Sequence, residues 1–231
     1  MSLDRISCPS SRQPSHCVII ANGDRPTQKV AQRYARAADL LLAADGGARH
    51  ALALGLTPDV VIGDMDSLNE QDQARLRAVG TRLLVHPPDK DETDLELALS
   101  YALEQGAASI TVLGALGGRL DQLLANILLL TMPALAEREV RLVDGAQTAF
   151  VVRDAARLEG QVGDTVSLIP LRGDARGVTT GGLLYPLEDD VLPFGLGLGV
   201  SNEITATPVS IRLRQGLLLC VHLSRERLQE V

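Results

Sequence analysis

Two aspartates stand one residue apart in the segment DVVIGDMDSL, residues 59–68. Asp64 and Asp66 follow an apolar run that is typical of a buried strand. In extended backbone, side chains at positions i and i+2 point to the same side, so we expect both carboxylates to face one site. At a separation of about 4 Å and an effective dielectric of about 20, two such charges repel by roughly 4 kcal/mol. The pattern therefore predicts a cation-binding site.

Further acidic residues follow neighbouring apolar runs. Asp45 comes after LLLAA and precedes Gly46, while Asp91 and Asp94 lie in DKDETD, shortly after RLLVH. Ligands of open α/β sheets bind at the carboxyl ends of the strands, so we expect these carboxylates to meet at one edge. One aspartate alone in such a place is usually a helix cap or a turn residue. A group of them at successive strand ends predicts an all-oxygen site, which favours Mg²⁺ over zinc.

A phosphate-binding loop is indicated by LGALGGRLDQ, which follows the apolar run ITVLG. Gly118 lets the backbone approach a ligand closely and frees amides for phosphate oxygens. Arg119 could clamp a phosphate, and Asp121 lies near the start of the next helix. Asn22 lies in a similar loop after the first apolar run, and Lys90 lies among the acidic residues. The chain contains neither a Walker A loop nor a GxGxxG motif.

These ingredients together suit phosphoryl or pyrophosphoryl transfer from a metal–nucleotide complex. In that chemistry positioning and charge neutralisation supply most of the catalysis. A Ser-His-Asp arrangement is not legible, and the four histidines share no spacing, so we interpret them as structural.

Apolar runs alternate with helical patterns in the first half of the chain, which predicts a parallel sheet covered on both faces. Thr93 and Glu96 form a capping box at the start of one helix, which ends at Gly106. After Pro133 only short β-like runs follow, so we expect an all-β sandwich or barrel. The strands are expected at 17–21, 40–44, 59–63, 82–86 and 110–114, and the helices at 27–38, after Gly47, at 70–79, 93–106 and 119–130. The domains are expected to be a flexible tail at 1–15, an α/β domain at 16–143 and a β-sandwich at 144–231.

Composition excludes several classes of function. The chain has 231 residues, a net charge of −7 and 2% aromatic residues with no Trp, which argues against a nucleic-acid partner. It has no run of 18 apolar residues and no secretory signal pattern, so we expect no membrane span. Cys8, Cys17 and Cys220 are widely spaced, which argues against a disulfide framework and fits a cytoplasmic location.

The motifs AADGGARH, GDMDS, DKDETD, LGALGGRLDQ and GVSNE, in this order, resemble those of the thiamine pyrophosphokinase family. The resemblance covers residues 17–223. It implies that residues 16–143 are a Rossmann-like α/β catalytic domain that binds ATP and Mg²⁺, and that residues 144–231 are a thiamine-binding β-sandwich. It also implies a homodimer with the active site between subunits. It also implies Mg²⁺-dependent transfer of pyrophosphate from ATP to the hydroxyl of thiamine, which gives thiamine diphosphate and AMP.

The resemblance also implies roles for residues that match the family motifs. The catalytic residues would be Asp64, Asp66, Asp94 and Arg119, and the Mg²⁺ ligands Asp45, Asp64, Asp66 and Asp94. The ATP-side residues would be Asn22, Asp45, Gly46, Lys90, Gly118, Arg119 and Asp121, and the thiamine-side residues Asp91, Ser201 and Asn202. Asp94 would either accept the hydroxyl proton or position the substrate. The family often carries an aromatic ring near SNE, whereas Ile204 stands here, so we expect an apolar contact in its place.

Three other interpretations remain open at this stage. DMDS resembles the nucleophile motif of haloacid-dehalogenase-type phosphatases, but it lies on about the third strand and is followed by Ser-Leu. A pyrophosphokinase acting on a pterin alcohol would share the broad fold, but GVSNE argues against it. A sensor that binds ATP without turnover would not need so many carboxylates in one place.

Overall fold

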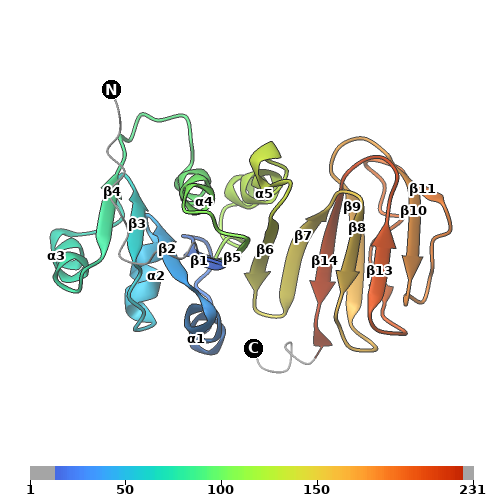
Figure 1. Cartoon of the computed structure of the whole chain (residues 1–231), viewed down its shortest axis with the longest axis horizontal. Coiled ribbons are helices and arrows are strands. Elements are labelled where there is room, and N and C mark those ends of the chain that lie inside the picture. Colours follow the sequence, from blue (N-terminus) through green and yellow to red (C-terminus); the bar gives the residue numbers. More distant parts are fainter. Residues whose placement is uncertain (1–13, 226–231) are drawn as a thin grey trace.

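The computed structural model describes residues 14–225. These residues form an α/β half and a β-sandwich half, and one ten-stranded sheet runs through both (Figure 1). The N-terminal tail expected at 1–15 therefore lies almost wholly outside the described residues. Among the helices of residues 14–225, none combines the length and apolarity that crossing a membrane requires.

The first half contains the alternating elements that the sequence predicts. Its strands are β1 (His16–Ile20), β2 (Leu40–Ala44), β3 (Val60–Gly63), β4 (Arg82–Val85) and β5 (Ser109–Leu113). Its helices are α1 (Gln28–Ala37), α2 (Gly47–Ala53), α3 (Glu70–Ala78), α4 (Asp94–Glu104) and α5 (Leu120–Leu129). Every strand and helix predicted here is confirmed to within a few residues.

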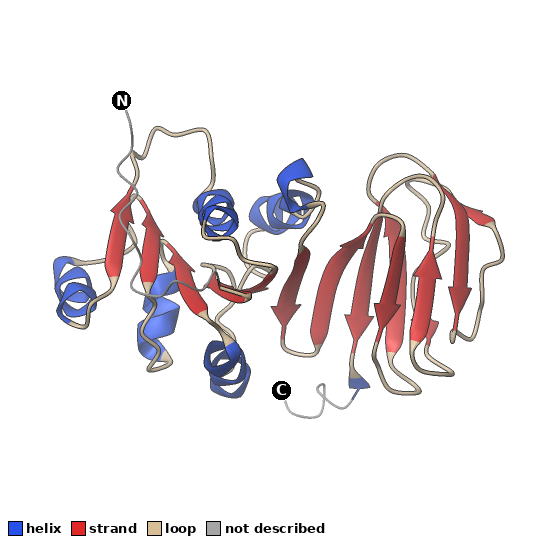
Figure 2. Ribbon diagram, viewed as in Figure 1, coloured by secondary structure: helices blue, strands red, loops and turns tan. Residues whose placement is uncertain are grey.

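Helices cover both faces of this parallel region, with α4 and α5 on one side and α1, α2 and α3 on the other (Figures 1 and 2). The side chains of β1 show why. Cys17 and Ile19 pack in the apolar cluster that contains α4, whereas Val18 and Ile20 pack in the cluster that contains α1 and α2. Because both faces are buried, the strands are apolar throughout rather than alternating.

The strand order creates a crevice at one edge of the sheet. The parallel strands run in the order β5-β1-β2-β3-β4, so the chain moves outward from β1 and then returns to its other side at β5. Ligands of open α/β sheets bind where the order reverses, outside the carboxyl ends of the strands. The loops at 22–24 and 114–118 lie at that point, because they follow β1 and β5.

One strand belongs to both halves of the molecule. β6 (Glu139–Asp144), which follows the short helix η1 (Pro133–Leu135), pairs in parallel with β5 and antiparallel with β7 (Gln147–Val152). Only Gly145 and Ala146 separate β6 from β7, so the ten-stranded sheet continues without a linker. The division of the chain at residue 144 stays a prediction.

The second half is a β-sandwich, as the sequence predicts. Its remaining strands are β8 (Ala155–Leu158), β9 (Thr165–Pro170), β10 (Ala175–Gly181), β11 (Asp190–Leu192), β12 (Asn202–Glu203), β13 (Val209–Arg212) and β14 (Leu218–Leu223). A four-stranded sheet in the order β11-β10-β13-β8 packs against the antiparallel end of the large sheet around a separate apolar core. Strand β10 ends at Gly181, because Gly182 adopts a φ of 82° and turns the chain.

A buried carboxylate ties the end of β14 to the turn before β9. Asp164 is 2% exposed and accepts hydrogen bonds from the backbone N–H groups of Gln161 and Arg225, each at 2.9 Å. His222 Nε2 donates a third at 2.8 Å. Burial opposes ionisation, but these three donors lower the pKa of Asp164 below its ordinary value.

We expect Asp164→Asn to reduce the free energy of unfolding by about 1–3 kcal/mol at pH 7, because a buried charged acceptor is lost. A lowered pKa stabilises the fold above the ordinary Asp pKa of about 3.9, and this contribution disappears as pH falls through the folded-state pKa. Urea titrations from pH 7 to pH 3 should show the difference between variant and wild type shrinking below about pH 4. Asp154→Asn, at an exposed site, is the control. A difference that grows on acidification would contradict the assignment.

Candidate active site

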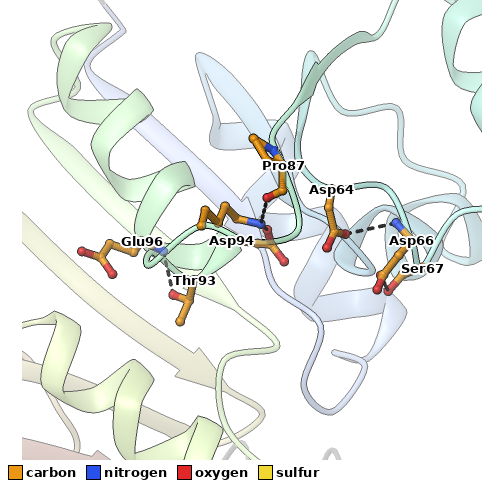
Figure 3. Close-up of polar contacts among 8 residues, drawn as sticks. Asp64, Asp66, Ser67, Pro87, Thr93, Asp94 and Glu96 are labelled. Atoms are coloured by element: carbon orange, nitrogen blue, oxygen red, sulfur yellow. Dashed lines mark hydrogen bonds and ion pairs between the residues drawn. The ribbon is translucent and has the colours of Figure 1, made fainter.

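Three carboxylates converge where β2 and β3 end. One oxygen from each of Asp45, Asp64 and Asp66 lies within 4.8 Å of the others. The expectation that the Asp64 and Asp66 carboxylates lie together is confirmed. The expectation that the backbone between them is extended is wrong. Met65 has a φ of 65°, and the backbone N–H of Asp66 donates to Asp64 Oδ1 at 3.1 Å (Figure 3). The two carboxylates share a site because the chain turns back on itself.

Asp45 is the buried member of this cluster. Its side chain is 5% exposed, and its Oδ1 has no hydrogen-bond partner among residues 14–225. Burial raises the pKa of Asp45, as do the negative charges of Asp94 and Asp66, against a lowering contribution from the Ser67 hydroxyl. An unpartnered buried carboxylate oxygen is costly, so this geometry fits a bound cation.

Glycines let the walls of this site approach one another. A Cβ at Gly63 would lie 2.7 Å from the Cβ of Asp45 and 3.1 Å from Asp94 Oδ1. A side chain at Gly46 would collide with the amide of Asn22. The glycines in GDMDS and DGG therefore bring β1, β2, β3 and α4 close enough for their polar groups to share one space.

Asp94 is placed by a helix cap. Thr93 Oγ1 accepts a hydrogen bond from the backbone N–H of Glu96 at 3.2 Å, which fixes Asp94 as the first residue of α4 (Figure 3). Lys90 Nζ forms an ion pair with Asp94 Oδ1 at 3.0 Å, and it donates to Pro87 O at 3.4 Å. Burial opposes the charge of Lys90, but the Asp94, Asp64 and Asp45 carboxylates raise its pKa.

A cleft of about 630 Å³ connects the acidic cluster to the predicted phosphate loop. Of the residues predicted from the sequence, it is lined by Asn22, Asp45, Asp66, Lys90, Asp94, Gly118 and Arg119. Arg119 directs Nε and Nη2 to the carboxylate of Asp121 at 3.1 and 2.5 Å. Both side chains are largely exposed, so the guanidinium can exchange this partner for a phosphate at little cost.

The sequence interpretation missed other polar residues of this cleft, namely Asp24, Ser67, Glu92, Thr93, Gln122 and Asn126. Asn126 is buried and donates from Nδ2 to the carbonyl of Ala115 at 2.7 Å, which ties α5 to the loop after β5. A signal for it existed, because Asn126 is a lone polar residue in the apolar run LLANILLL.

The predicted thiamine-side residues do not join this cleft. Asp91 is exposed and is not among the lining residues. Ser201 and Asn202 line a separate, mainly apolar pocket of about 300 Å³ in the sandwich. There the Asn202 amide donates to Tyr185 O at 2.7 Å and accepts from Tyr185 N at 3.0 Å.

Ile204 does not supply the apolar contact that the sequence suggested. It is fully buried in the sandwich core, and it bridges to Leu183. The exposed ring beside Ser201 is instead Tyr185, whose side chain is 68% exposed and whose backbone Asn202 holds in place. The aromatic surface near GVSNE thus comes from a distant segment of the chain.

Comparisons with known proteins give a consistent result. Residues 31–143 match the family model for the thiamin pyrophosphokinase catalytic domain, and residues 155–218 match that for its vitamin B1 binding domain. Thiamine pyrophosphokinase from Bacillus subtilis is 30% identical over 206 residues, which cover 88% of this chain and 96% of the relative. Thiamin pyrophosphokinase 1 from Caenorhabditis elegans is 31% identical over 186 residues, covering 72% and 70%.

A solved structure is similar over nearly its whole length. The crystal structure of the Bacillus subtilis thiamine pyrophosphokinase superposes with a TM-score of 0.80 at 28% identity, covering 91% of this chain and 99% of that one. Sequence motifs, an acidic cluster at the carboxyl ends of parallel strands and an appended sandwich all agree with these matches. The chain belongs to the thiamine pyrophosphokinase family.

Proposed function

We propose that this protein transfers pyrophosphate from ATP to the hydroxyl of thiamine, in a Mg²⁺-dependent reaction that yields thiamine diphosphate and AMP. The observation that carries the proposal is the unpartnered buried oxygen of Asp45 in a three-carboxylate cluster. That cluster opens into a cleft whose other end is the Gly118–Arg119 loop.

Asp45, Asp64 and Asp66 would hold Mg²⁺, with Asp94 beside them. Their donor atoms are all carboxylate oxygens, which are the ligands that Mg²⁺ prefers. Bound there, the ion would neutralise phosphate oxygens and so lower the barrier to displacement. The cluster is negative and partly buried, so it would repel the nucleotide phosphates without a cation.

The reaction forms a bond from the thiamine hydroxyl oxygen to the β-phosphorus of ATP. The bond from that phosphorus to the oxygen bridging it to the α-phosphorus breaks, and AMP departs with that oxygen. Lys90 and Arg119 line the same cleft and would offset the charge that develops on the phosphates. Asp94 lies beside the metal cluster, so we assign it to positioning, and the proton of the attacking hydroxyl passes to solvent.

The thiamine would come from the sandwich side, where the Tyr185 ring, Ser201 and the pocket of about 300 Å³ offer a flat, mainly apolar surface. This pocket and the acidic cleft share no lining residue. A site that needs both surfaces is therefore incomplete within one chain. We propose a homodimer in which the sandwich of one subunit faces the cleft of the other.

Two exposed apolar surfaces support the homodimer. On α5, Leu120, Leu124 and Leu128 are 69%, 51% and 53% exposed and recur every four residues, so they share one face. In the sandwich, the exposed apolar side chains include Leu184, Tyr185, Phe194, Leu196, Leu198 and Val200. Large exposed apolar surfaces are typical of protein interfaces. In a two-fold dimer each such surface can cover the other.

The activity is tested by incubating the protein with ATP, Mg²⁺ and thiamine and separating the products by chromatography. We expect equal amounts of AMP and thiamine diphosphate, and neither product when EDTA is present or thiamine is left out. ADP in place of AMP would show ordinary phosphoryl transfer and would overturn the attack at the β-phosphorus. ATP binding with no product would favour a sensor.

We expect Asp64→Asn and Asp66→Asn to fold normally but to lose turnover by several orders of magnitude, because each removes charge that would hold the metal. The measurement is kcat in the same assay, together with a circular dichroism spectrum. Glu70→Gln removes an exposed carboxylate just beyond the cluster and should keep wild-type activity. Near-native turnover in both aspartate variants would contradict the assignment of Asp64 and Asp66 as metal ligands.

We expect Leu124→Glu to give a monomer with little activity, because a charge would be buried at the proposed interface. Light scattering gives the mass, and the product assay gives the activity. Val79→Glu, at a 56% exposed apolar residue after α3, should stay dimeric and active. A monomeric wild-type protein with full activity would rule out a shared site.

A further inference from the structure

Lys90 is an unusual lysine for a loop residue. Its side chain is only 12% exposed, although it lies in the segment between β4 and α4. It is held from two directions, by Asp94 Oδ1 at 3.0 Å and by the carbonyl of Pro87 at 3.4 Å. A lysine whose only task is to meet an incoming phosphate does not need to be buried in advance. The ammonium group of Lys90 is therefore paired within the chain before any substrate arrives.

The role of this pairing follows from the charges around Lys90. Asp45, Asp64 and Asp66 share one small space, and Asp94 approaches Asp45 across Gly63. Among the charged residues that line the cleft, the other cation is Arg119, which is directed to Asp121. Lys90 therefore supplies the compensating charge next to the acidic cluster.

We propose that Lys90 is the internal counter-ion of the acidic cluster, and that a divalent cation binds there in competition with its ammonium group. The counter-ion role does not depend on the proposed function, but the next step, in which Lys90 contacts the nucleotide, rests on it. Once the cation has taken over the carboxylates, the ammonium is released from Asp94 toward the phosphates of the nucleotide. Lys90 thereby makes the metal and the nucleotide bind better together than separately.

Two opposite consequences follow for one substitution. Without Lys90 the cluster keeps its full negative charge, so a divalent cation should bind more tightly in the absence of nucleotide. Nearby charges of like sign weaken cation binding, and one charge a few ångströms away changes affinity on the order of tenfold. ATP should bind more weakly, because a phosphate partner is lost. A residue that only contacted phosphate would produce the second effect without the first.

The test is a titration of the full-length protein with Mn²⁺, without ATP or thiamine, with free Mn²⁺ followed by electron paramagnetic resonance. Lys90→Met should lower the Mn²⁺ dissociation constant about tenfold relative to wild type. Lys29→Met is the matched control, because Lys29 is the other lysine of the chain and is exposed on α1. It should leave the constant unchanged, and Lys90→Arg, which keeps the charge, should stay within a few-fold of wild type.

Unchanged or weaker Mn²⁺ binding by Lys90→Met overturns the proposal, as does a failure of both wild type and variant to bind Mn²⁺. If Lys90→Met does not fold, Lys90→Gln answers the same question. ATP affinity, measured by calorimetry with saturating Mg²⁺, should fall in Lys90→Met, and an unchanged value would also count against the proposal. The Mn²⁺ titration contains no substrate, so it is independent of the activity assay. If Lys90→Met binds Mn²⁺ more tightly than wild type but wild type forms no thiamine diphosphate, the counter-ion role stands and the proposed function fails.

Discussion

Mutual repulsion among carboxylates at the ends of β2 and β3 is the constraint around which this half of the molecule is arranged. Parallel pairing of these strands fixes the distance between Asp45 and the Asp64–Asp66 turn, so the charges cannot separate without breaking the sheet. Gly63 closes the remaining gap toward Asp94. The fold stabilises this arrangement with aliphatic packing on both faces of the sheet, and the proposed cation would relieve the repulsion on binding.

Periodicity was enough to predict the elements of the first half, because strands buried on both faces are continuous apolar runs and the helices between them carry capping signals. It was not enough for the local geometry of the site. Asp64 and Asp66 converge as expected, but through a turn at Met65, whose positive φ is uncommon for a residue other than glycine and has no signal in the residue types. The prediction that these residues group together was correct, although the backbone conformation from which it was argued was not.

The sandwich shows a different limit. Whether a residue near GVSNE faces a ligand depends on contacts with segments far away in the chain. Ile204 is buried because it bridges to Leu183, and Asn202 is occupied because its amide binds the backbone of Tyr185. Neither partner can be identified from spacing, since the pairing of short β-strands is set by long-range packing. Ser201 and Asn202 of the family motif line the sandwich pocket, but spacing alone does not identify the other side chains that form it.

The shared strand β6 has a consequence for how a complete site can form. It joins the parallel and antiparallel regions through hydrogen bonds on both edges, and only two residues separate it from β7. A hinge between the two halves would have to break that ladder, so the sandwich pocket of a chain cannot swing over its own acidic cleft without losing sheet hydrogen bonds. Closure within one subunit is therefore costly, which supports the homodimer proposed above. The continuous sheet favours a site assembled between chains.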